Sequence, residues 1–245
     1  MIVTLGVKKE IFLNLLKWII FSIISIGLVV GLIIYSNSTK LNIDSIDAYA
    51  VQVASTDNGN IADHVFGKLD SAVTLIEYAD FQCPGCASIS PTIKLITDLY
   101  KDQLQFVFRN YPITNLHPNA KAASAAAEAA GLQNKYWEMH DKIYATQSDW
   151  DSLNITERTT FFVGLANELS LDTSKFTSDM SSPSVASKIS FDQALGLKIN
   201  VESTPTFILN GTSLATTTWG NVSKLKTAID DELKKAGLDL PQTTN

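Results

Sequence analysis

The sequence predicts an α/β fold that contains an inserted helical block and follows a single transmembrane helix. Three observations support this fold class. Residues 73–109 show a strand–helix–strand pattern, residues 112–200 show helical patterns without a convincing strand, and residues 206–235 show two strands and a helix. An apolar run at residues 18–35 precedes all of them. Strands and helices mixed in this order are typical of an α/β domain.

Composition narrows the classes of function. The 245 residues are 45% apolar and 18% charged, and their formal net charge is −6. This charge provides no basic surface, so a nucleic-acid partner is not expected. Eleven Phe, seven Tyr and four Trp supply enough core material to argue against a disordered chain. Only two cysteines are present, which excludes a disulfide-stapled mini-protein and a four-cysteine zinc site.

The apolar run at residues 18–35 predicts a membrane anchor. It reads WIIFSIISIGLVVGLIIY and contains no charge. At ~1.5 Å per residue the helix is ~27 Å long, close to the ~30 Å of a hydrocarbon core. Three lysines precede it: Lys8, Lys9 and Lys17. We therefore expect residues 1–17 to be cytoplasmic and the C-terminal domain to be extracytoplasmic, in a single-pass protein of the cell membrane.

A cleaved signal peptide and a buried soluble helix are the alternatives to this anchor. The apolar core of a signal peptide is normally ~7–15 residues long and is followed at once by small residues. Here the run is longer and is followed by SNSTK, and an Ala-x-Ala occurs only at Ala48–Ala50. The pattern favours an uncleaved anchor.

Residues 36–62 are expected to form a tether. They are rich in Ser, Asn, Asp and Thr and show no sustained helical or strand period. The chemistry-bearing domain is therefore expected at residues 63–236, followed by a flexible tail at 237–245.

The domain begins with a predicted β–α–β unit. Val73–Tyr78 is apolar and β-branched and reads as a buried strand, and Leu104–Arg109 alternates as a second strand. Four apolar residues between them recur at helical spacing: Ile89, Ile93, Ile96 and Leu99. A helix between two strands favours a parallel pair with a right-handed crossover.

A helical insertion at about 112–200 follows. Pro118 can open a helix, and eight alanines lie between Ala120 and Ala130. Further helical candidates are 136–144, 156–169 and 184–197.

The chain closes with a strand, a turn, a second strand and a helix. Thr206–Leu209 reads as a strand, Asn210-Gly211 is a hairpin signal, and Leu214–Thr218 is the expected partner strand. Asn221–Lys235 is the expected last helix, with an apolar face and lysines at its C-terminal end.

Both cysteines lie in one Cys83-Pro84-Gly85-Cys86 motif, at the junction between a strand and a helix. The helix N-terminus offers free N–H groups and a positive dipole end, which lower the pKa of Cys83 below the ~8.5 of a free thiol. Pro84 fits the first helical turn because its missing N–H costs no helical bond. Cys86, three residues on, can resolve a mixed disulfide. These positions favour a redox-active disulfide.

Other interpretations of the cysteine pair are weaker. A structural disulfide across a two-residue loop restrains little entropy of the unfolded chain. A metal site needs more ligands, and the three histidines, at 64, 117 and 140, are scattered, so no metal is expected. Haem attachment needs a histidine where Ala87 stands.

The segment from Asp63 to Gly67, continued through VTLIEYADFQCPGC, resembles the DsbA-type thioredoxin-fold oxidoreductases. Ser203-Thr204-Pro205-Thr206-Phe207 resembles the cis-proline loop of that family. The alanine-rich helical block resembles its inserted helical subdomain. The resemblance covers residues from about 63 to 236 and implies a thioredoxin-like fold of the DsbA type.

The resemblance implies roles for individual residues. Glu77 matches the buried acidic residue beneath the disulfide, and its position on an apolar strand is itself expected to raise the pKa of its carboxyl. It could then exchange a proton with Cys86; the alternative is an exposed glutamate at a sheet edge. Sequence alone places Pro205 at the start of a strand, where trans is the default. The resemblance implies a cis bond, with the Thr204 backbone facing the disulfide and pairing with an extended substrate.

One departure from the family concerns the dipeptide between the cysteines. Pro84-Gly85 differs from the Pro-His of strongly oxidising members and from the Gly-Pro of thioredoxin. Gly85 places no side chain beside Cys83, so we expect a less extreme oxidant, and the redox direction stays open. Pro84, Gly85 and Thr204 are the expected substrate contacts.

The leading functional prediction is a membrane-tethered thiol–disulfide oxidoreductase that donates disulfides to exported proteins. Its only redox group is the Cys83–Cys86 disulfide, with no cofactor. The resemblance implies a membrane re-oxidase of the DsbB or vitamin K epoxide reductase type as a second partner. A reductase or isomerase of the same fold, or a non-catalytic binding or chaperone module, is the alternative.

Overall fold

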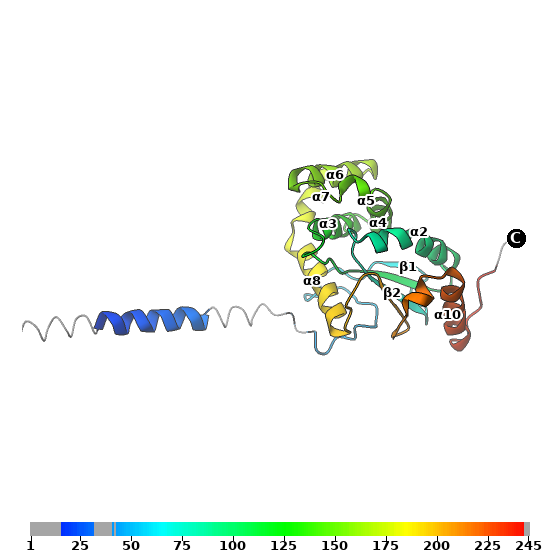
Figure 1. Cartoon of the computed structure of the whole chain (residues 1–245), viewed down its shortest axis with the longest axis horizontal. Coiled ribbons are helices and arrows are strands. Elements are labelled where there is room, and N and C mark those ends of the chain that lie inside the picture. Colours follow the sequence, from blue (N-terminus) through cyan, green and yellow to red (C-terminus); the bar gives the residue numbers. More distant parts are fainter. Residues whose placement is uncertain (1–15, 32–40, 42, 243–245) are drawn as a thin grey trace, which may run out of the picture. The chain divides into compact units, whose positions relative to one another are not determined.

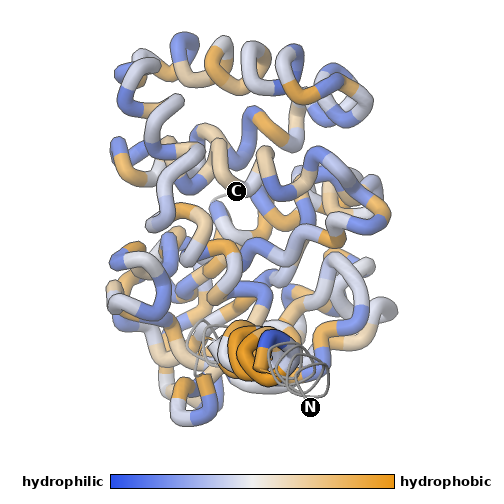
Figure 2. The backbone as a smooth tube through the Cα atoms, turned by 90° about the vertical axis from the view of Figure 1, so that its left-hand side faces the viewer, coloured by the Kyte–Doolittle hydropathy of each residue, from blue (hydrophilic) through white to orange (hydrophobic). Residues whose placement is uncertain are grey.

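The computed structural model describes residues 16–31, 41 and 43–242, in two units, Met1–Asn42 and Ile43–Asn245, which are treated separately. Residues 16–31 form a helix whose large apolar side chains are exposed, and Figure 2, which looks along this helix, shows its visible turns mostly in the hydrophobic colour. Within the described ranges, no helix has both the length and the apolar character needed to cross a membrane.

Several predictions concern residues outside those ranges. The predicted membrane span includes residues 32–35, which are not among the described residues. The same holds for the N-terminal residues 1–15, for residues 36–40 and 42 of the expected tether, and for the last three residues of the tail.

The second unit contains one five-stranded sheet with the order β1-β3-β2-β4-β5 (Figure 1). The strands are β1 (Val65–Gly67), β2 (Thr74–Ala79), β3 (Gln105–Asn110), β4 (Thr206–Leu209) and β5 (Thr212–Ser213). The pair β2–β3 is parallel and the other three pairs are antiparallel. The expected parallel β–α–β unit is confirmed, whereas β1 is too short to be found from a pattern.

The two central strands, β2 and β3, are buried along nearly their whole length. All six residues of β3, and five of the six in β2, are buried. A strand buried on both faces reads as a continuous apolar run rather than an alternation. Glu77 therefore stands out in β2, where its neighbours across the sheet are Phe108 on β3 and Phe207 on β4.

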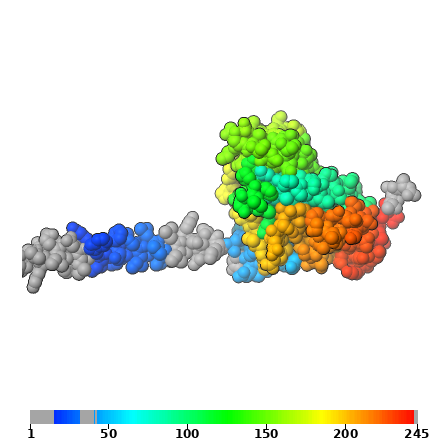
Figure 3. Space-filling model, viewed as in Figure 1, coloured from blue at the N-terminus to red at the C-terminus, as the bar shows by residue number. Residues whose placement is uncertain are grey.

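Helices surround this sheet. Helix α2 (Pro84–Leu99) follows β2, and α10 (Val222–Lys235) closes the domain. Six helices lie between β3 and β4: α3 (Ala120–Gly131), α4 (Tyr136–Ala145), α5 (Gln147–Trp150), α6 (Ile155–Glu168), α7 (Thr173–Met180) and α8 (Pro183–Lys198). No strand occurs in that stretch, all of which is described, so the predicted helical insertion is confirmed. Figure 3 shows much of it, in green and yellow, as a continuous lobe.

Helix α2 contributes to two separate cores. Its first turn places Cys86 among Phe81, Phe108 and the alanines of α3, between the sheet and the helical insertion. Its later turns place Ile93 and Ile96 in the core that the sheet shares with α10. The start of α2 is therefore held between the two parts of the domain.

The predicted strand at Leu214–Thr218 is wrong. Strand β5 comes earlier, because the tight turn at Asn210-Gly211 pairs Leu209 directly with Thr212. Residues Thr216–Trp219 instead form the short helix α9. The Trp219 ring lies 5.4 Å from that of Phe207, so this segment packs down on the sheet instead of extending it.

The predicted tether also needs correction, because residues 43–62 pack against the α/β unit. Arg109 donates hydrogen bonds to the carbonyls of Ala48 and Ala50, both at 2.6 Å. Lys198, on α8, donates to three carbonyls of residues 43–46 at 2.7–2.9 Å. The segment contains no helix or strand; side chains from β3 and α8 bind its carbonyls instead. The compact unit therefore begins near residue 43 rather than 63.

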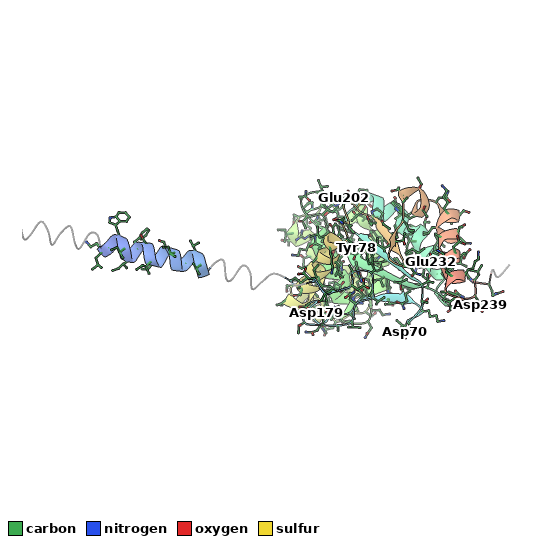
Figure 4. All side chains as sticks on the ribbon, turned by 90° about the horizontal axis from the view of Figure 1, so that it is seen from below. Asp70, Tyr78, Asp179, Glu202, Glu232 and Asp239 are labelled. Carbon is green, nitrogen blue, oxygen red and sulfur yellow. The ribbon has the colours of Figure 1, made fainter. Side chains whose placement is uncertain are left out.

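A buried ionic cluster lies where this segment, β3 and α8 meet. Asp63 contacts Arg109 at 2.8 Å and Lys188 at 2.7 Å, and Lys188 also contacts Asp192 at 2.6 Å. Burial alone would raise the pKa of Asp63, but the two cations lower it well below its usual range. Arg109 also donates to the hydroxyl of Tyr78, which Figure 4 labels within the unit. Removing one partner of such a cluster is far more destabilising than losing a surface pair.

Candidate active site

Cys83 and Cys86 lie at the N-terminus of α2, as the sequence predicts. Cys83 is the N-cap residue in an extended conformation, and Pro84 occupies the first turn, where its missing N–H leaves no helical bond unmade. Both cysteines are free thiols, so the structure represents the dithiol form. Cys83 is half-buried, whereas Cys86 is fully buried. Only the first of the two sulfurs is therefore open to an incoming substrate.

The pKa values of the two thiols are shifted in opposite directions. A hydrogen bond from the Cys86 thiol is the largest cause that lowers the pKa of Cys83, to about 5, and the backbone N–H groups of Gly85 and Cys86 act in the same direction. Burial is the largest cause that raises the pKa of Cys86 well above its usual range, assisted by the hydrogen bond to Cys83 and by the charge of Glu77. At neutral pH, Cys83 is a thiolate and Cys86 a thiol.

Glu77 is a buried carboxyl in the centre of the sheet. It is 3% exposed, and burial alone raises its pKa to about 8. Because β2 has a strand on each side, the alternative of an exposed edge glutamate is wrong. The charge of Glu77 acts on Cys86, so the two groups are close enough to interact electrostatically. A carboxyl with a pKa near 8 is mostly protonated at pH 7 and can give a proton to a thiolate.

The loop of Thr204 and Pro205 lies beside the thiols although it is far away in the sequence. The Thr204–Pro205 peptide bond is cis, as the resemblance implies. The Thr204 carbonyl is 3.5 Å from the Cys83 sulfur. A Cβ added to Gly85 would lie 3.7 Å from both the Cys83 sulfur and the Pro205 ring. The structure thus brings Cys83, Gly85, Thr204 and Pro205 together, and space for a bulky side chain at position 85 is limited.

Three polar residues that belong to no sequence motif fix the loop before Cys83. Gln147, on α5, donates to the carbonyls of Phe81 and Cys83 at 2.7 and 3.2 Å. Asp80 is buried and accepts from the backbone N–H of Gln82, and its other oxygen contacts His117 at 2.7 Å. The only sequence signal for Asp80 is that a polar residue stands directly after a buried strand. Nothing in the sequence around Gln147 or His117 indicates their contacts.

The three histidines lie in separate clusters. His64 contacts Glu128, His117 contacts Asp80, and His140 contacts Asp141. None of these contacts joins a histidine to Cys83 or Cys86. Among the described residues, no group of three or more His, Cys, Asp or Glu side chains is placed to hold a metal ion.

A family model described as thioredoxin matches residues 59–231, which is well over half of the chain. The chain belongs to the thioredoxin family. Within this family its fold is of the DsbA type, because solved structures named DsbA superpose on it over more than nine-tenths of their length. The domain is similar to BdbD from Bacillus subtilis, with a TM-score of 0.62 and 23% identity over 76% of this chain and 98% of that one. It is also similar to alpha-DsbA1 from Wolbachia pipientis, with a TM-score of 0.62 and 18% identity over 71% and 92%.

Other similar proteins are matched over very different shares of their own length. A thioredoxin-like oxidoreductase from Silicibacter pomeroyi has a TM-score of 0.57 and 26% identity over 70% of this chain and 92% of that one. The Na(+)/H(+) antiporter NhaA 1 of Salinispora arenicola is 37% identical over 150 residues, which are 61% of this chain but 22% of the antiporter. The corresponding protein of Herminiimonas arsenicoxydans is 32% identical over 62% and 23%. The chain thus spans less than a quarter of the length of these curated relatives.

Proposed function

We propose that this protein is a membrane-tethered thiol–disulfide oxidoreductase that donates its Cys83–Cys86 disulfide to exported proteins. The observation that carries this proposal is the asymmetry of the two thiols, one accessible and acidic, the other buried and weakly acidic. Thioredoxin-family membership and the DsbA-type neighbours support an oxidoreductase enzyme.

The reaction transfers two electrons from the substrate to the enzyme disulfide. A substrate thiolate attacks the sulfur of Cys83, the Cys83–Cys86 bond breaks, and Cys86 leaves as a thiolate that takes a proton from Glu77. The second thiolate of the substrate then attacks the mixed disulfide and releases Cys83. A leaving thiol of low pKa departs faster, so a Cys83 pKa of about 5 favours oxidation of the substrate.

The cis-proline loop is proposed as the docking surface for the substrate backbone. The Thr204 carbonyl lies beside the Cys83 sulfur, and Thr206 opens strand β4 directly after it. An extended peptide can pair with backbone groups at such a position, next to Pro84 and Gly85. Binding through the backbone depends little on the side chains of the substrate, which suits an enzyme with many unfolded substrates.

The cell membrane is the proposed location, with residues 18–35 as the anchor and the α/β unit outside the cytoplasm. The described helix at residues 16–31 is apolar and exposed on all sides, a pattern that is unstable in water and stable in lipid. Disulfides persist in an extracytoplasmic compartment. The proposed partners are exported proteins with free thiols and a membrane re-oxidase of the DsbB or vitamin K epoxide reductase type.

Trapping of substrates tests the proposed roles. In Cys86→Ser, the mixed disulfide with Cys83 cannot be resolved by the enzyme, so we expect this variant to accumulate mixed disulfides with extracytoplasmic proteins, detected on non-reducing gels. The matched Cys83→Ser variant is expected to trap none. Equal trapping by both variants would contradict the assignment of Cys83 as nucleophile.

The redox direction is tested separately. A reduction potential measured against glutathione, together with oxidation of a dithiol peptide by the full-length protein in detergent, distinguishes a donor of disulfides from a reductase. A potential as low as that of thioredoxin, with insulin reduction faster than peptide oxidation, would favour the reductase. Absence of turnover in both assays would favour a binding module.

A further inference from the structure

A small cavity lies between the sheet and helices α2 and α4, on the side of Glu77. Its volume is about 20 Å³, which is room for about one water molecule. Apolar lining comes from Phe66 and Phe106 on the sheet and from Trp137 on α4. The ionisable residues that line it are Glu77, Lys94, His140 and Asp141.

The cavity joins a buried carboxyl to an ion pair at the surface. The Glu77 side chain lines the cavity, and within residues 43–242 its carboxyl has neither a side-chain hydrogen bond nor an ion pair. At the other end, Lys94 Nζ lies 3.0 Å from an oxygen of Asp141, and about half of the Lys94 side chain is exposed. The cavity therefore has the buried Glu77 and the partly exposed Lys94 in one lining.

His140 lines the same cavity. It is 6% exposed and stands among aromatic rings, with Phe108 at 4.8 Å and Trp137 at 5.2 Å between ring centres. Its Nδ1 lies 3.0 Å from Asp141, whereas its Nε2 is buried and has no hydrogen-bond partner among the described residues. A buried polar atom without a partner has a cost in stability, which packing of the ring alone does not explain.

We infer that His140, one cavity water and the Asp141–Lys94 pair form the path by which Glu77 exchanges its proton with solvent. This inference rests on the proposed function, because the path is needed only if Cys86 gains and loses a proton in turnover. His140 is here a positioning and relay residue, since it does not touch either sulfur.

The proton balance requires such a path. When Cys86 leaves as a thiolate, Glu77 gives it a proton and becomes a buried carboxylate. The substrate loses two protons to solvent as its thiols become a disulfide, and one proton must return from solvent to Glu77 through the cavity. Re-oxidation of Cys83 and Cys86 runs the same transfer backwards. The direct route past Cys86 is closed, because that sulfur is fully buried in the apolar core.

The electrostatics around His140 suit a neutral relay. Burial is the largest cause that lowers its pKa, and Asp141 opposes this only in part. The ionisable groups that face the cavity are Glu77 from β2, Lys94 from α2 and Asp141 from α4, while β1 and β3 contribute only Phe66 and Phe106. A neutral imidazole with Nδ1–H held by Asp141 presents Nε2 as an acceptor, the state that can receive a proton.

The test uses the full-length protein in detergent, a fluorescent dithiol peptide and glutathione disulfide as the oxidant that re-forms the Cys83–Cys86 disulfide, with stopped-flow rates from pH 6 to 8.5 in weak buffer. His140→Gln keeps polarity but cannot relay, and Ile143→Val, in the same helix but outside the cavity, is the control for packing. We expect His140→Gln to slow turnover about tenfold and to enlarge the solvent deuterium isotope effect, and the control to stay within about twofold.

Chemical rescue distinguishes a relay from a structural role. In His140→Ala, added imidazole should restore the rate and the pH profile, while pyrrole, of the same shape without a basic nitrogen, should not. Equal rates for His140→Gln and Ile143→Val, or equal rescue by pyrrole, would overturn the inference. If His140→Ala does not fold, the His140→Gln isotope effect decides alone. An inactive wild-type protein would instead refute the proposed function.

Discussion

At the scale of single residues, identical side chains acquire opposite chemistry from their places on α2. Cys83 stands before the first turn, where N–H groups and the Cys86 thiol point at its sulfur. Cys86 lies one turn further on, inside an apolar core and close to the charge of Glu77. The first environment stabilises a thiolate and the second opposes one.

The acidity of Cys83 can be measured by alkylation. We expect the rate at which iodoacetamide alkylates Cys83 in the reduced protein to rise with pH, with a midpoint near pH 5. Mass spectrometry of samples alkylated between pH 3.5 and 9 measures this rate. Cys86→Ala removes the largest stabilising contact, so the midpoint should move toward the ~8.5 of a free thiol. Cys86→Ser keeps a hydroxyl donor and should stay near the wild-type value. An unchanged midpoint in Cys86→Ala would show that the helix terminus alone controls this pKa.

Glu77 is expected to make stability fall as pH rises. Its pKa is about 8 in the folded protein against 4.5 as the ordinary value, so the unfolded chain ionises first and is favoured increasingly between pH 4.5 and 8. From pH 5 to pH 8 this amounts to a loss on the order of 3 kcal/mol.

Glu77→Gln tests this linkage, because the amide cannot ionise. Urea unfolding of the oxidised protein at pH 5 and pH 8 should show a smaller loss of stability for the variant than for wild type. The comparison cancels other groups that titrate in this range, such as Asp192. The same pH dependence in both proteins would place the pKa of Glu77 near its ordinary value.

The site residues found from sequence are those that a local motif carries. Cys83 and Cys86 form one short motif, and Glu77 and Pro205 stand at positions where the resemblance points directly. Gln147 and His140 could not be found in this way. Their contacts with the site depend on how α4 and α5 fold back over the start of α2, which no spacing in the sequence reports.

At the scale of elements, the segment at residues 43–62 is held by its fit against α8. Gly59 has a φ of +68°, and a Cβ on it would overlap the carbonyl of Ser184 in the first turn of that helix. The position therefore requires glycine for two reasons, the left-handed backbone and the close approach.

Substitution at Gly59 measures how firmly this segment is docked. We expect Gly59→Ala to lower the free energy of unfolding by more than the ~1 kcal/mol of the backbone effect. Gly237→Ala is the matched control, since Gly237 has a φ of +69° and no atom within 4 Å of its added Cβ. Equal losses of stability in the two variants, measured by urea unfolding, would show that the 43–62 segment can move away from α8 without destabilising the fold.

Elements whose apolar residues recur at a regular spacing can be predicted from the sequence, and elements defined by tertiary contacts cannot. The parallel strands β2 and β3 and the last helix were found within about a residue of their observed ends, because apolar runs and helical spacing mark them. Strand β1 has no sequence signature, because three residues are too few to show an alternating pattern. The docked segment reads as a tether because its composition is polar, while its partners Arg109 and Lys198 lie far along the chain.

At the scale of the whole molecule, the α/β unit is expected to be independent of the apolar helix. A fragment of residues 41–245 should fold and oxidise the dithiol peptide at nearly the full-length rate. A fragment of residues 63–245 lacks the carbonyls of Ala48 and Ala50, which leaves the buried Arg109 short of acceptors. It should be less stable by roughly 3 kcal/mol or more, since hydrogen bonds to charged groups are worth ~1.5–3 kcal/mol each.

Urea unfolding and peptide oxidation of the two fragments check this expectation. Equal stability of both would mean that residues 43–62 contribute nothing to the fold. An aggregated, inactive 41–245 fragment, with active full-length protein in detergent, would show that the unit depends on the apolar helix.

The docking of residues 43–62 also limits how far the α/β unit of the proposed enzyme can lie from its proposed anchor. Of the 27 residues from 36 to 62, between the proposed anchor and Asp63, those from 43 onward belong to the compact unit, which leaves seven residues of sequence, 36–42, between the anchor and that unit. At ~3.5 Å per residue, the maximum length of the connecting chain falls from ~95 Å for all of residues 36–62 to ~25 Å for residues 36–42. Under the proposed anchoring, we expect such an enzyme to act on chains as they emerge at the bilayer surface rather than on proteins that have already diffused away, and to remain within reach of the proposed membrane re-oxidase.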